Sequence, residues 1–403
     1  MGWYKIIPAH QKAAPNRFLM YFFSCLLITC ITFFARCKHP PGPDADPRGD
    51  LYAGTAACIS CHQDISNSWL HNNHYRTSAA THPGKLKKGA VSSGTTFYFA
   101  DSSYIRIDTL ERAIFQSYFA DGGPGVSEKM DCSFGSGEKA RTYGYWKEDK
   151  LYQLPLTWFA KTNSWANSPG FPATHARFGR VITSRCFECH ASYIKKESVQ
   201  TGSLSVSEKL DRNSIVYGID CERCHGPALE HANFHRQNPS LRTARHITRI
   251  SALSRQQQLD ICAVCHSGND QAADRSLFAF VPGDTLSQFY FPDFGSPGAE
   301  PDVHGKQIQL LASSKCFRNS NMTCATCHHT HGDEGHGLTG FVSTCMGCHQ
   351  NSTHAKKNLA IATNNCIDCH MPLQTSKIIT FNNGAGLQNI PYLIRTHRIA
   401  IYK

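Results

Sequence analysis

The chain has 403 residues, of which 41% are hydrophobic and 18% are charged, and it contains 19 cysteines and 22 histidines. The length exceeds what one hydrophobic core usually fills, and this composition excludes a disordered protein and a small disulfide-stabilised domain. The formal net charge of +11 raises nucleic acid or an anionic membrane surface as a partner, depending on what the cysteines bind.

The N-terminal segment 1–37 is interpreted as a signal peptide or membrane anchor. Basic residues without any acid precede an uncharged apolar run over 18–35. This order is typical of export, and the run is at the short limit for a membrane span. Cys37 is a candidate lipidation site of a lipoprotein, although Arg36 departs from the small residue that usually precedes one. We favour a protein anchored by lipid or by an uncleaved helix, followed by a Pro-rich linker over 38–50.

From residue 58 onwards, the pattern Cys-x-x-Cys-His occurs seven times. Its cysteines are Cys58, Cys61, Cys186, Cys189, Cys221, Cys224, Cys262, Cys265, Cys324, Cys327, Cys345, Cys348, Cys366 and Cys369, and its histidines are His62, His190, His225, His266, His328, His349 and His370. Two thiols at this spacing attach to the two vinyl groups of a haem, and the following imidazole becomes the proximal iron ligand. Zinc sites do not require a histidine after each pair, and a redox dithiol would occur once. The motifs therefore predict seven covalent haem c groups.

The spacing of these motifs divides the remaining chain. We expect a first haem module at 51–85, a β-rich insertion at 86–170, haems 2–4 at 171–266, an extended crossover at 267–315, haems 5–7 at 316–372 and a C-terminal tail at 373–403. From Thr95 to Trp158, aromatic and β-branched residues alternate with polar ones, which predicts a small antiparallel sheet. Gly135, Gly137 and Gly144 are interpreted as turn residues.

The predicted fold class is α+β with low regular secondary structure. It corresponds to a multihaem cytochrome c in which short helices and loops surround packed haems, with the small antiparallel insertion added. Outside the insertion, the chain is expected to consist of short helices and loops, because the haems replace much of the core that side chains would otherwise form.

Each iron needs a sixth ligand if it is to transfer electrons, and histidine is far more abundant than methionine here. The candidate distal ligands are His74, His175, His231, His304, His331 and His354. A reserve set contains His71, His235, His246, His329, His336 and His397. His231, His331 and His354 closely follow motifs, and we expect each to cap a neighbouring haem. Bis-histidine ligation predicts low reduction potentials.

Two cysteines after the export segment lie outside the motifs. Cys132 and Cys316 are interpreted as buried thiols, with a disulfide between them as the alternative in an oxidising compartment.

The chain resembles exported multihaem cytochromes built on the cytochrome c-554-like module. The resemblance rests on YAGTAACISCHQDISNSWLHNNHYRTS, on FGSGEKARTY followed by KLYQLPLTWF, and on NSPGFP, GIDCERCHGPALEH, DVHGKQI and CATCHHTHGDE, and it covers most of 51–372. It implies electron transfer among stacked haems, with His74, His175, His231, His304 and His331 as distal ligands. The nitrite reductases that share this haem packing have a lysine in place of one proximal histidine, and that lysine is absent here.

Two functions remain open at this stage. The favoured one is an electron-transfer relay between a membrane donor and a periplasmic or extracellular acceptor, with no catalytic residue of its own. The alternative is a multihaem oxidoreductase in which one open haem acts on a small nitrogen or sulfur oxyanion or on hydroxylamine, with Arg141, Tyr143 or Arg177 binding the anion. The haem propionates compensate the basic charge of the chain, which excludes nucleic acid as a partner. The expected partners are redox proteins, with the membrane reached through the N-terminal anchor.

Overall fold

The structure is a computed structural model that describes residues 46–85, 94–120, 123–268, 270–291, 301–332, 337–350, 365–382 and 389–402. The chain separates into two units, Met1–Ala45 and Asp46–Lys403, and all described residues belong to the second. The predicted anchor segment, Cys37 and His354 lie outside the described residues and stay predictions. Within the described ranges, no helix has the length and apolar character needed to cross a membrane.

The predicted β insertion forms two antiparallel sheets. The first runs in the order β2 (Thr95–Tyr98), β3 (Tyr104–Leu110), β4 (Ala113–Ala120) and β5 (Gly123–Lys129). The second runs through β1 (Ser78–Ala80), β6 (Cys132–Phe134), β7 (Ala140–Lys147), β8 (Lys150–Gln153) and β11 (Val181–Ile182), while β9 (Leu156–Phe159) joins β7 and β10 (Ser164–Asn167) joins β9. Alternate residues of β3, Ile105 and Ile107, are buried, because successive side chains of a strand point to opposite faces.

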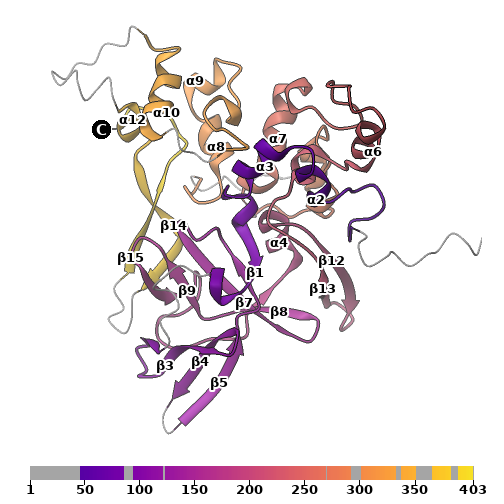
Figure 1. Ribbon diagram of the computed structural model, residues 1–403. Helices are drawn as coiled ribbons and strands as arrows, with labels where there is room; N and C mark the ends of the chain where they lie inside the picture. The colour runs from indigo at the N-terminus through magenta and orange to yellow at the C-terminus, as the bar shows by residue number, and fades with distance from the viewer. Residues whose placement is uncertain are drawn as a thin grey trace, which may run out of the picture. The chain divides into compact units, whose positions relative to one another are not determined.

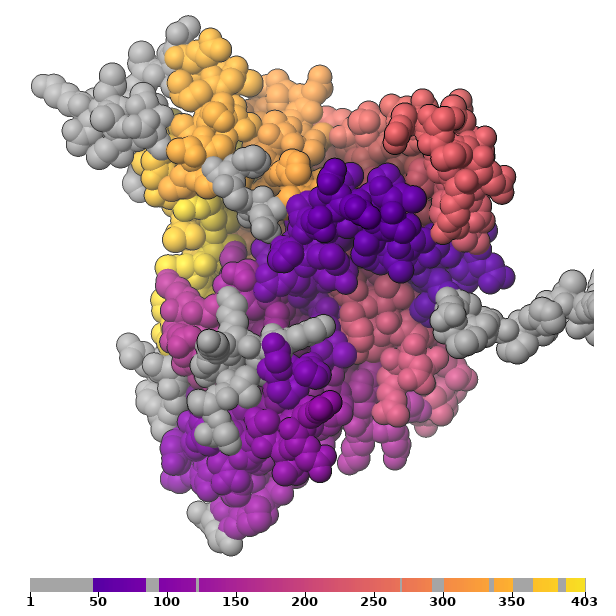
Figure 2. Space-filling view, viewed as in Figure 1, coloured from indigo at the N-terminus to yellow at the C-terminus, as the bar shows by residue number. Residues whose placement is uncertain are grey.

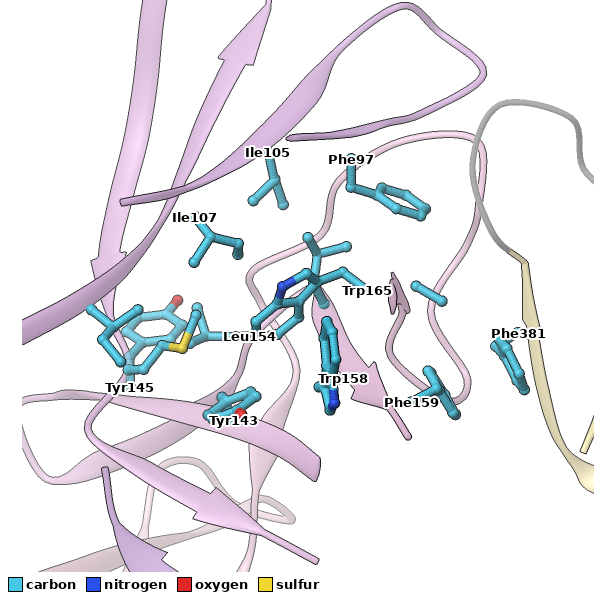
Figure 3. Packing of buried hydrophobic residues seen from close by; sticks show 14 of the residues in the cluster. Phe97, Ile105, Ile107, Tyr143, Tyr145, Leu154, Trp158, Phe159, Trp165 and Phe381 are labelled. Carbon is cyan, nitrogen blue, oxygen red and sulfur yellow. The ribbon is translucent and has the colours of Figure 1, made fainter. Parts of the chain in front are cut away.

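The hydrophobic core of the insertion is built from side chains of both sheets (Figure 3). The Trp158 and Trp165 rings meet edge to face with centroids 5.6 Å apart, a geometry that aromatic quadrupoles favour. Phe381, from the C-terminal part of the chain, stacks on Phe159 with centroids 3.8 Å apart. This core is therefore complete without a cofactor. It also includes Phe381 from a strand near the C-terminal end of the chain.

Two of the predicted turn glycines lie in turns and the third does not. Gly135 and Gly137 have positive φ angles of 94° and 85°, which only glycine adopts readily. Gly144 instead lies inside β7, where an added Cβ would approach the Tyr152 carbonyl oxygen at 3.2 Å. Close packing of the neighbouring strand, and not a turn, explains this glycine.

Two long hairpins correct the expectation of short helices and loops outside the insertion. They are β12 (Ala191–Gln200) with β13 (Val206–Tyr217), and β14 (Leu373–Asn382) with β15 (Asn389–Arg395). In β12 only the first residues are buried, and the following KKES residues are exposed. The strands project beyond the core, so their sequences lack the apolar alternation that predicts a half-buried strand.

The helices are short. They are α2 (Thr55–Ile59), α3 (Gln63–Trp69), α4 (Ser184–His190), α5 (Cys221–His225), α6 (Leu229–Gln237), α7 (Arg255–His266), α8 (Gln307–Ala312), α9 (Lys315–Arg318), α10 (Gly337–Met346) and α12 (Cys366–His370). The 3₁₀ turns are η1 (Tyr75–Thr77), η2 (Pro83–Lys85), η3 (Ile250–Ala252), η4 (Leu277–Ala279), η5 (Leu286–Phe289) and η6 (Cys324–Thr326). Figure 1 shows the helices apart from strands β3–β5, with the hairpin β14–β15 between the two groups. The predicted α+β class with antiparallel sheets is confirmed.

Candidate haem-binding site

Each Cys-x-x-Cys-His motif folds as about one helical turn. The histidine N–H donates to the carbonyl of the first cysteine at 2.9 Å in the motifs that end at His62, His328 and His349. The helices α4, α5, α7 and α12 likewise end at their motif histidines. One turn brings residues four apart onto the same side, so the two thiols and the imidazole of a motif are presented together.

All seven motifs border one cavity of about 2910 Å³. Every predicted proximal histidine lines it, together with at least one cysteine from each motif. A single small ligand typically occupies a pocket of about 300–1,000 Å³, so this cavity has room for several groups. Figure 2 shows the indigo segment, which carries the first motif, beside later parts of the chain. The Asn72 side chain fixes this segment by donating to the Gly332 carbonyl at 2.7 Å.

Oxygen atoms hold the Nδ1 nitrogens of several proximal histidines. The Nδ1–H of His370 donates to the Ala400 carbonyl at 2.9 Å, and that of His225 donates to the Thr248 carbonyl at 3.2 Å. His190 Nδ1 lies 3.1 Å from the Thr77 hydroxyl. A proton held on Nδ1 leaves Nε2 unprotonated, which is the form that binds a metal.

Four proximal histidines each face a second imidazole across the cavity. The ring centroids are 6.2 Å apart for His62 and His231, 5.8 Å for His225 and His331, 6.0 Å for His266 and His74, and 6.1 Å for His328 and His397. Two imidazoles on opposite sides of one metal ion, at metal–nitrogen distances of about 2.0 Å, have ring centroids about 6 Å apart. The residues present therefore fit a bis-histidine iron at these four positions.

The distal candidates that enter these pairs are themselves oriented by hydrogen bonds. His231, at the start of α6, donates from Nδ1 to the Arg245 carbonyl at 2.7 Å. His74 follows α3, and its Nδ1 lies 3.2 Å from the Asn72 amide oxygen. The sequence motifs gave no signal for Asn72 or for the backbone carbonyls that orient the other rings, because these acceptors come from loops outside the motifs.

His304 and His190 both line the cavity, and they interact electrostatically. Burial, with a contribution from His304, lowers the pKa of His190 to about 4. Burial also lowers the pKa of His397 to about 4, with His328 as the next cause. Both imidazoles are therefore neutral at physiological pH, as an iron ligand must be.

The other distal predictions have different outcomes. His175 is exposed, its Nδ1 lies 3.0 Å from the Thr174 hydroxyl, and it does not line the cavity. The structure thus does not bring it to the motifs. His397, from the reserve set, does reach the cavity. The Nε2 of His235 is buried and has no hydrogen-bond partner among the described residues.

Basic side chains dominate the charged lining of the cavity. They are Lys139, Arg185, Arg223, Arg236, Arg242, Arg249, Lys306, Lys315, Arg318, Arg395 and Arg398, against the acids Asp220, Glu222 and Asp270. Asp270 is paired with Lys306, and the other two acids with Arg48. The lining therefore carries excess positive charge, which suits groups that bear carboxylates, such as haem propionates.

Acidic residues inside two motifs connect distant segments. Glu222, in the third motif, is buried and accepts hydrogen bonds from Arg48 and from the backbone N–H groups of Ala53, Gly54 and Ala228, all at 2.8–2.9 Å. Glu188, in the second motif, accepts from Arg185, Ser276 and the Leu277 N–H. Glu222 thus ties the third motif to the segment before the first, and Glu188 ties the second motif to the loop at Ser276 and Leu277. Sequence reasoning missed these anchors because it treated the positions between the cysteines as variable.

The two cysteines outside the motifs are both free thiols. Cys132 is fully buried in the second sheet, packed against Leu151 and Phe187. Cys316 lines the cavity and interacts electrostatically with Cys327 and Cys345. They therefore lie in different parts of the fold, and the disulfide alternative is not formed.

The residues proposed for anion binding at an open haem do not line the cavity. Tyr143 is buried in the core of the insertion, and Arg177 is exposed. Arg141 donates to the backbone carbonyls of Gly135 and Ser136. The structure thus gives these residues roles in packing and in a turn.

Comparison with known proteins gives two matches. The family model described as cytochrome c554 and c-prime matches residues 158–226, which contain the second and third motifs. The multiheme cytochrome MtrA of Shewanella baltica (strain OS185) is 29% identical over 160 residues, which cover 36% of this chain and 45% of the relative. No solved structure matches the chain. The two matches support the interpretation that the motifs predict: the chain is similar to multihaem c-type cytochromes, which carry covalently bound haem c.

Proposed function

We propose that the chain is a heptahaem c-type cytochrome that transfers electrons through mainly bis-histidine haems. The observation that carries this proposal is the set of four imidazole pairs with centroids 5.8–6.2 Å apart. The two imidazoles of each pair would hold a haem iron between them, whose chemistry would be one-electron transfer, and they would leave no position for a substrate.

The distal ligands follow from the pairs. His231 serves the first haem, His331 the third and His74 the fourth. His304, which lines the cavity and interacts electrostatically with His190, is the candidate for the second. In each case, the distal histidine comes from a segment other than the motif that it completes. Bis-histidine coordination favours low reduction potentials, which suits transfer from a membrane donor.

The order of the attachment points supports a relay. Cysteine side chains of different motifs lie close enough to interact in pairs: Cys58 with Cys221, Cys189 with Cys265, Cys262 with Cys324 and Cys345 with Cys366. Cys224 lies near Cys262, and Cys327 near Cys345. The haem sites, numbered by their motifs along the chain, therefore follow one another in the order one, three, four, five, six and seven. The second site lies to the side of this series, next to the fourth.

The location and partners form part of the proposal. Haem c is attached outside the cytoplasm in bacteria, and the basic and apolar N-terminal segment suits export to the periplasm or the cell surface. We propose an anchor by lipid at Cys37 or by an uncleaved helix, which keeps the first haem near a membrane donor. A redox protein receives the electrons, and nucleic acid is not a partner because the propionates cancel the basic charge.

The test is an iron count combined with spin-state spectroscopy on the purified, exported protein. We expect seven irons per chain, all low-spin, and no spectral response to nitrite or hydroxylamine. The double variant Cys366→Ser/Cys369→Ser removes one attachment site and is expected to give six irons. An iron count well below seven in the unmodified protein contradicts the haem number. A high-spin fraction near one seventh that responds to nitrite contradicts the pure relay and favours a reductase.

A further inference from the structure

The last residues of the chain leave the hairpin β14–β15 and run along the cavity. Thr396 is completely buried, and its N–H donates to the Pro372 carbonyl at 3.1 Å. The Ile399 N–H donates to the Ser314 hydroxyl at 2.8 Å. His397, between these two anchors, lines the cavity. The backbone around His397 is thus fixed on both sides by hydrogen bonds that do not involve its side chain.

The His397 ring faces the proximal histidine of the fifth motif. Its centroid lies 6.1 Å from that of His328, with an angle of 24° between the ring planes. This spacing matches the pairs His62–His231 and His225–His331, at 6.2 and 5.8 Å. His331 follows the fifth motif in sequence, but its ring stacks on His225. His331 is therefore engaged at the third haem.

The His397 ring is held by its own backbone neighbourhood. Its Nδ1 is buried, and the backbone acceptor with which the ring interacts is the Arg395 carbonyl. A proton held on Nδ1 leaves Nε2 unprotonated, which is the form that binds a metal.

We infer that His397 is the distal iron ligand of the fifth haem, supplied by the C-terminal segment 396–402. This inference rests on the proposed function and extends it, because no Cys-x-x-Cys-His motif lies within twenty residues of His397.

The same segment also holds the seventh motif. The Ala400 N–H donates to the His370 carbonyl at 3.1 Å, and the His370 Nδ1–H donates back to the Ala400 carbonyl at 2.9 Å. This carbonyl keeps the proton on Nδ1 and so leaves Nε2 of His370 for iron. One short segment therefore supplies the distal position of the fifth haem and orients the proximal ligand of the seventh.

The experiment compares His397→Ala and His397→Met with the control His82→Ala, measured on the exported holoprotein. His82 is exposed and does not line the cavity. For His397→Ala we expect an unchanged iron count, a high-spin signal from about one seventh of the haem, and its return to low spin on adding imidazole. His397→Met supplies a different sixth ligand and is expected to stay low-spin while one haem titrates at a higher potential.

Several results would overturn the inference. One is a fully low-spin His397→Ala protein with unchanged potentials and iron count. Another is a high-spin signal that His82→Ala produces equally, because the signal would then not depend on the distal position. If His397→Ala is not exported in a folded form, the folded His397→Met protein decides, and unchanged potentials there contradict the ligand role. An unmodified protein without the expected iron instead contradicts the proposed function.

Discussion

Single side chains in this protein hold the haem motifs in place, and Glu222 is the clearest example. Its carboxylate is almost completely buried, and it receives hydrogen bonds from three backbone N–H groups and from Arg48. Burial raises the pKa of Glu222, and the N–H groups and Arg48 oppose that rise. Because Arg48, Ala53 and Gly54 belong to the segment before the first motif, one side chain in the third motif fixes the first motif beside it.

Replacing Glu222 with glutamine tests this anchor. Glutamine keeps the shape, but its amide group turns a donor toward an N–H that needs an acceptor, and Arg48 loses one of its partners. We expect the free energy of unfolding to fall by about 2–4 kcal/mol, because a buried charge and a buried donor lose their partners. Chemical denaturation followed by circular dichroism measures the change.

The matched control for that variant is Glu230→Gln. Glu230 is exposed, and it forms an ion pair with His246. A surface pair contributes about 0–1 kcal/mol, so this variant is expected to unfold almost as the unmodified protein does. Equal stability of the two variants would mean that the contacts of Glu222 contribute nothing to the position of the first motif.

At the scale of elements, the hairpin β12–β13 supports the helix that carries the second motif. Glu208 on β13 accepts from the Ser184 N–H and hydroxyl, both at 2.9 Å, at the first turn of α4. Lys196 on β12 pairs with the same carboxylate at 3.0 Å. A carboxylate suits the N-terminal end of a helix, where backbone N–H groups lack partners. The hairpin that the sequence did not predict thus holds α4 in place.

The contribution of Glu208 is expected to depend on pH. Burial raises its pKa, but the hydrogen bonds from Ser184 and the charge of Lys196 outweigh burial and hold the pKa below the ordinary glutamate value of 4.5. A lowered pKa stabilises the folded state above the ordinary value, and this stabilisation is lost as the pH falls through the folded-state pKa. Glu208→Gln is therefore expected to cost about 1–2 kcal/mol at pH 7 and progressively less as the pH falls below 4.5.

Thermal melting of the two proteins between pH 7 and pH 3 checks this dependence. Glu197→Gln is the control, because Glu197 lies on the same hairpin and is exposed. A melting-temperature difference that stays constant over this range would show that the Glu208 charge has no part in holding α4.

At the scale of the whole molecule, two parts of the second unit are stabilised in different ways. The insertion has a core of aromatic and aliphatic side chains from both sheets (Figure 3). The motif helices instead border the cavity of about 2910 Å³, and α6 contains no buried residue. Helices of this length are marginal in water without tertiary packing. The haems are therefore expected to supply most of the packing for this part.

A chain produced without haem attachment tests this difference. We expect strands β3, β4 and β7 to keep their amide protection from hydrogen exchange, because their core is complete without a cofactor. The helices α5, α6 and α7 are expected to exchange about tenfold faster or more than in the holoprotein. Hydrogen exchange followed by mass spectrometry on both forms measures this. Uniform loss of protection in both parts would mean that the insertion also depends on the haems.

The sequence alone determined the chemistry that is local in the chain. Two thiols and an imidazole within five residues form one helical turn, so the motif predicts both its fold and its cofactor without reference to distant residues. The strands of the insertion were predicted because one of their faces is buried, which produces the alternation of Ile105 and Ile107 with polar neighbours. The hairpin β12–β13 escaped prediction because most of it is exposed on both faces.

The sixth ligand of each iron, in contrast, is decided only by the tertiary structure. His231, His331 and His397 each face a proximal histidine from a distant segment, and nothing in their flanking residues separates them from His175, which stays outside the cavity. A second imidazole must lie about 6 Å from the first, and only packing of distant segments creates that spacing. Covalent attachment needs neighbours in sequence, whereas the opposite face of the iron needs neighbours in space.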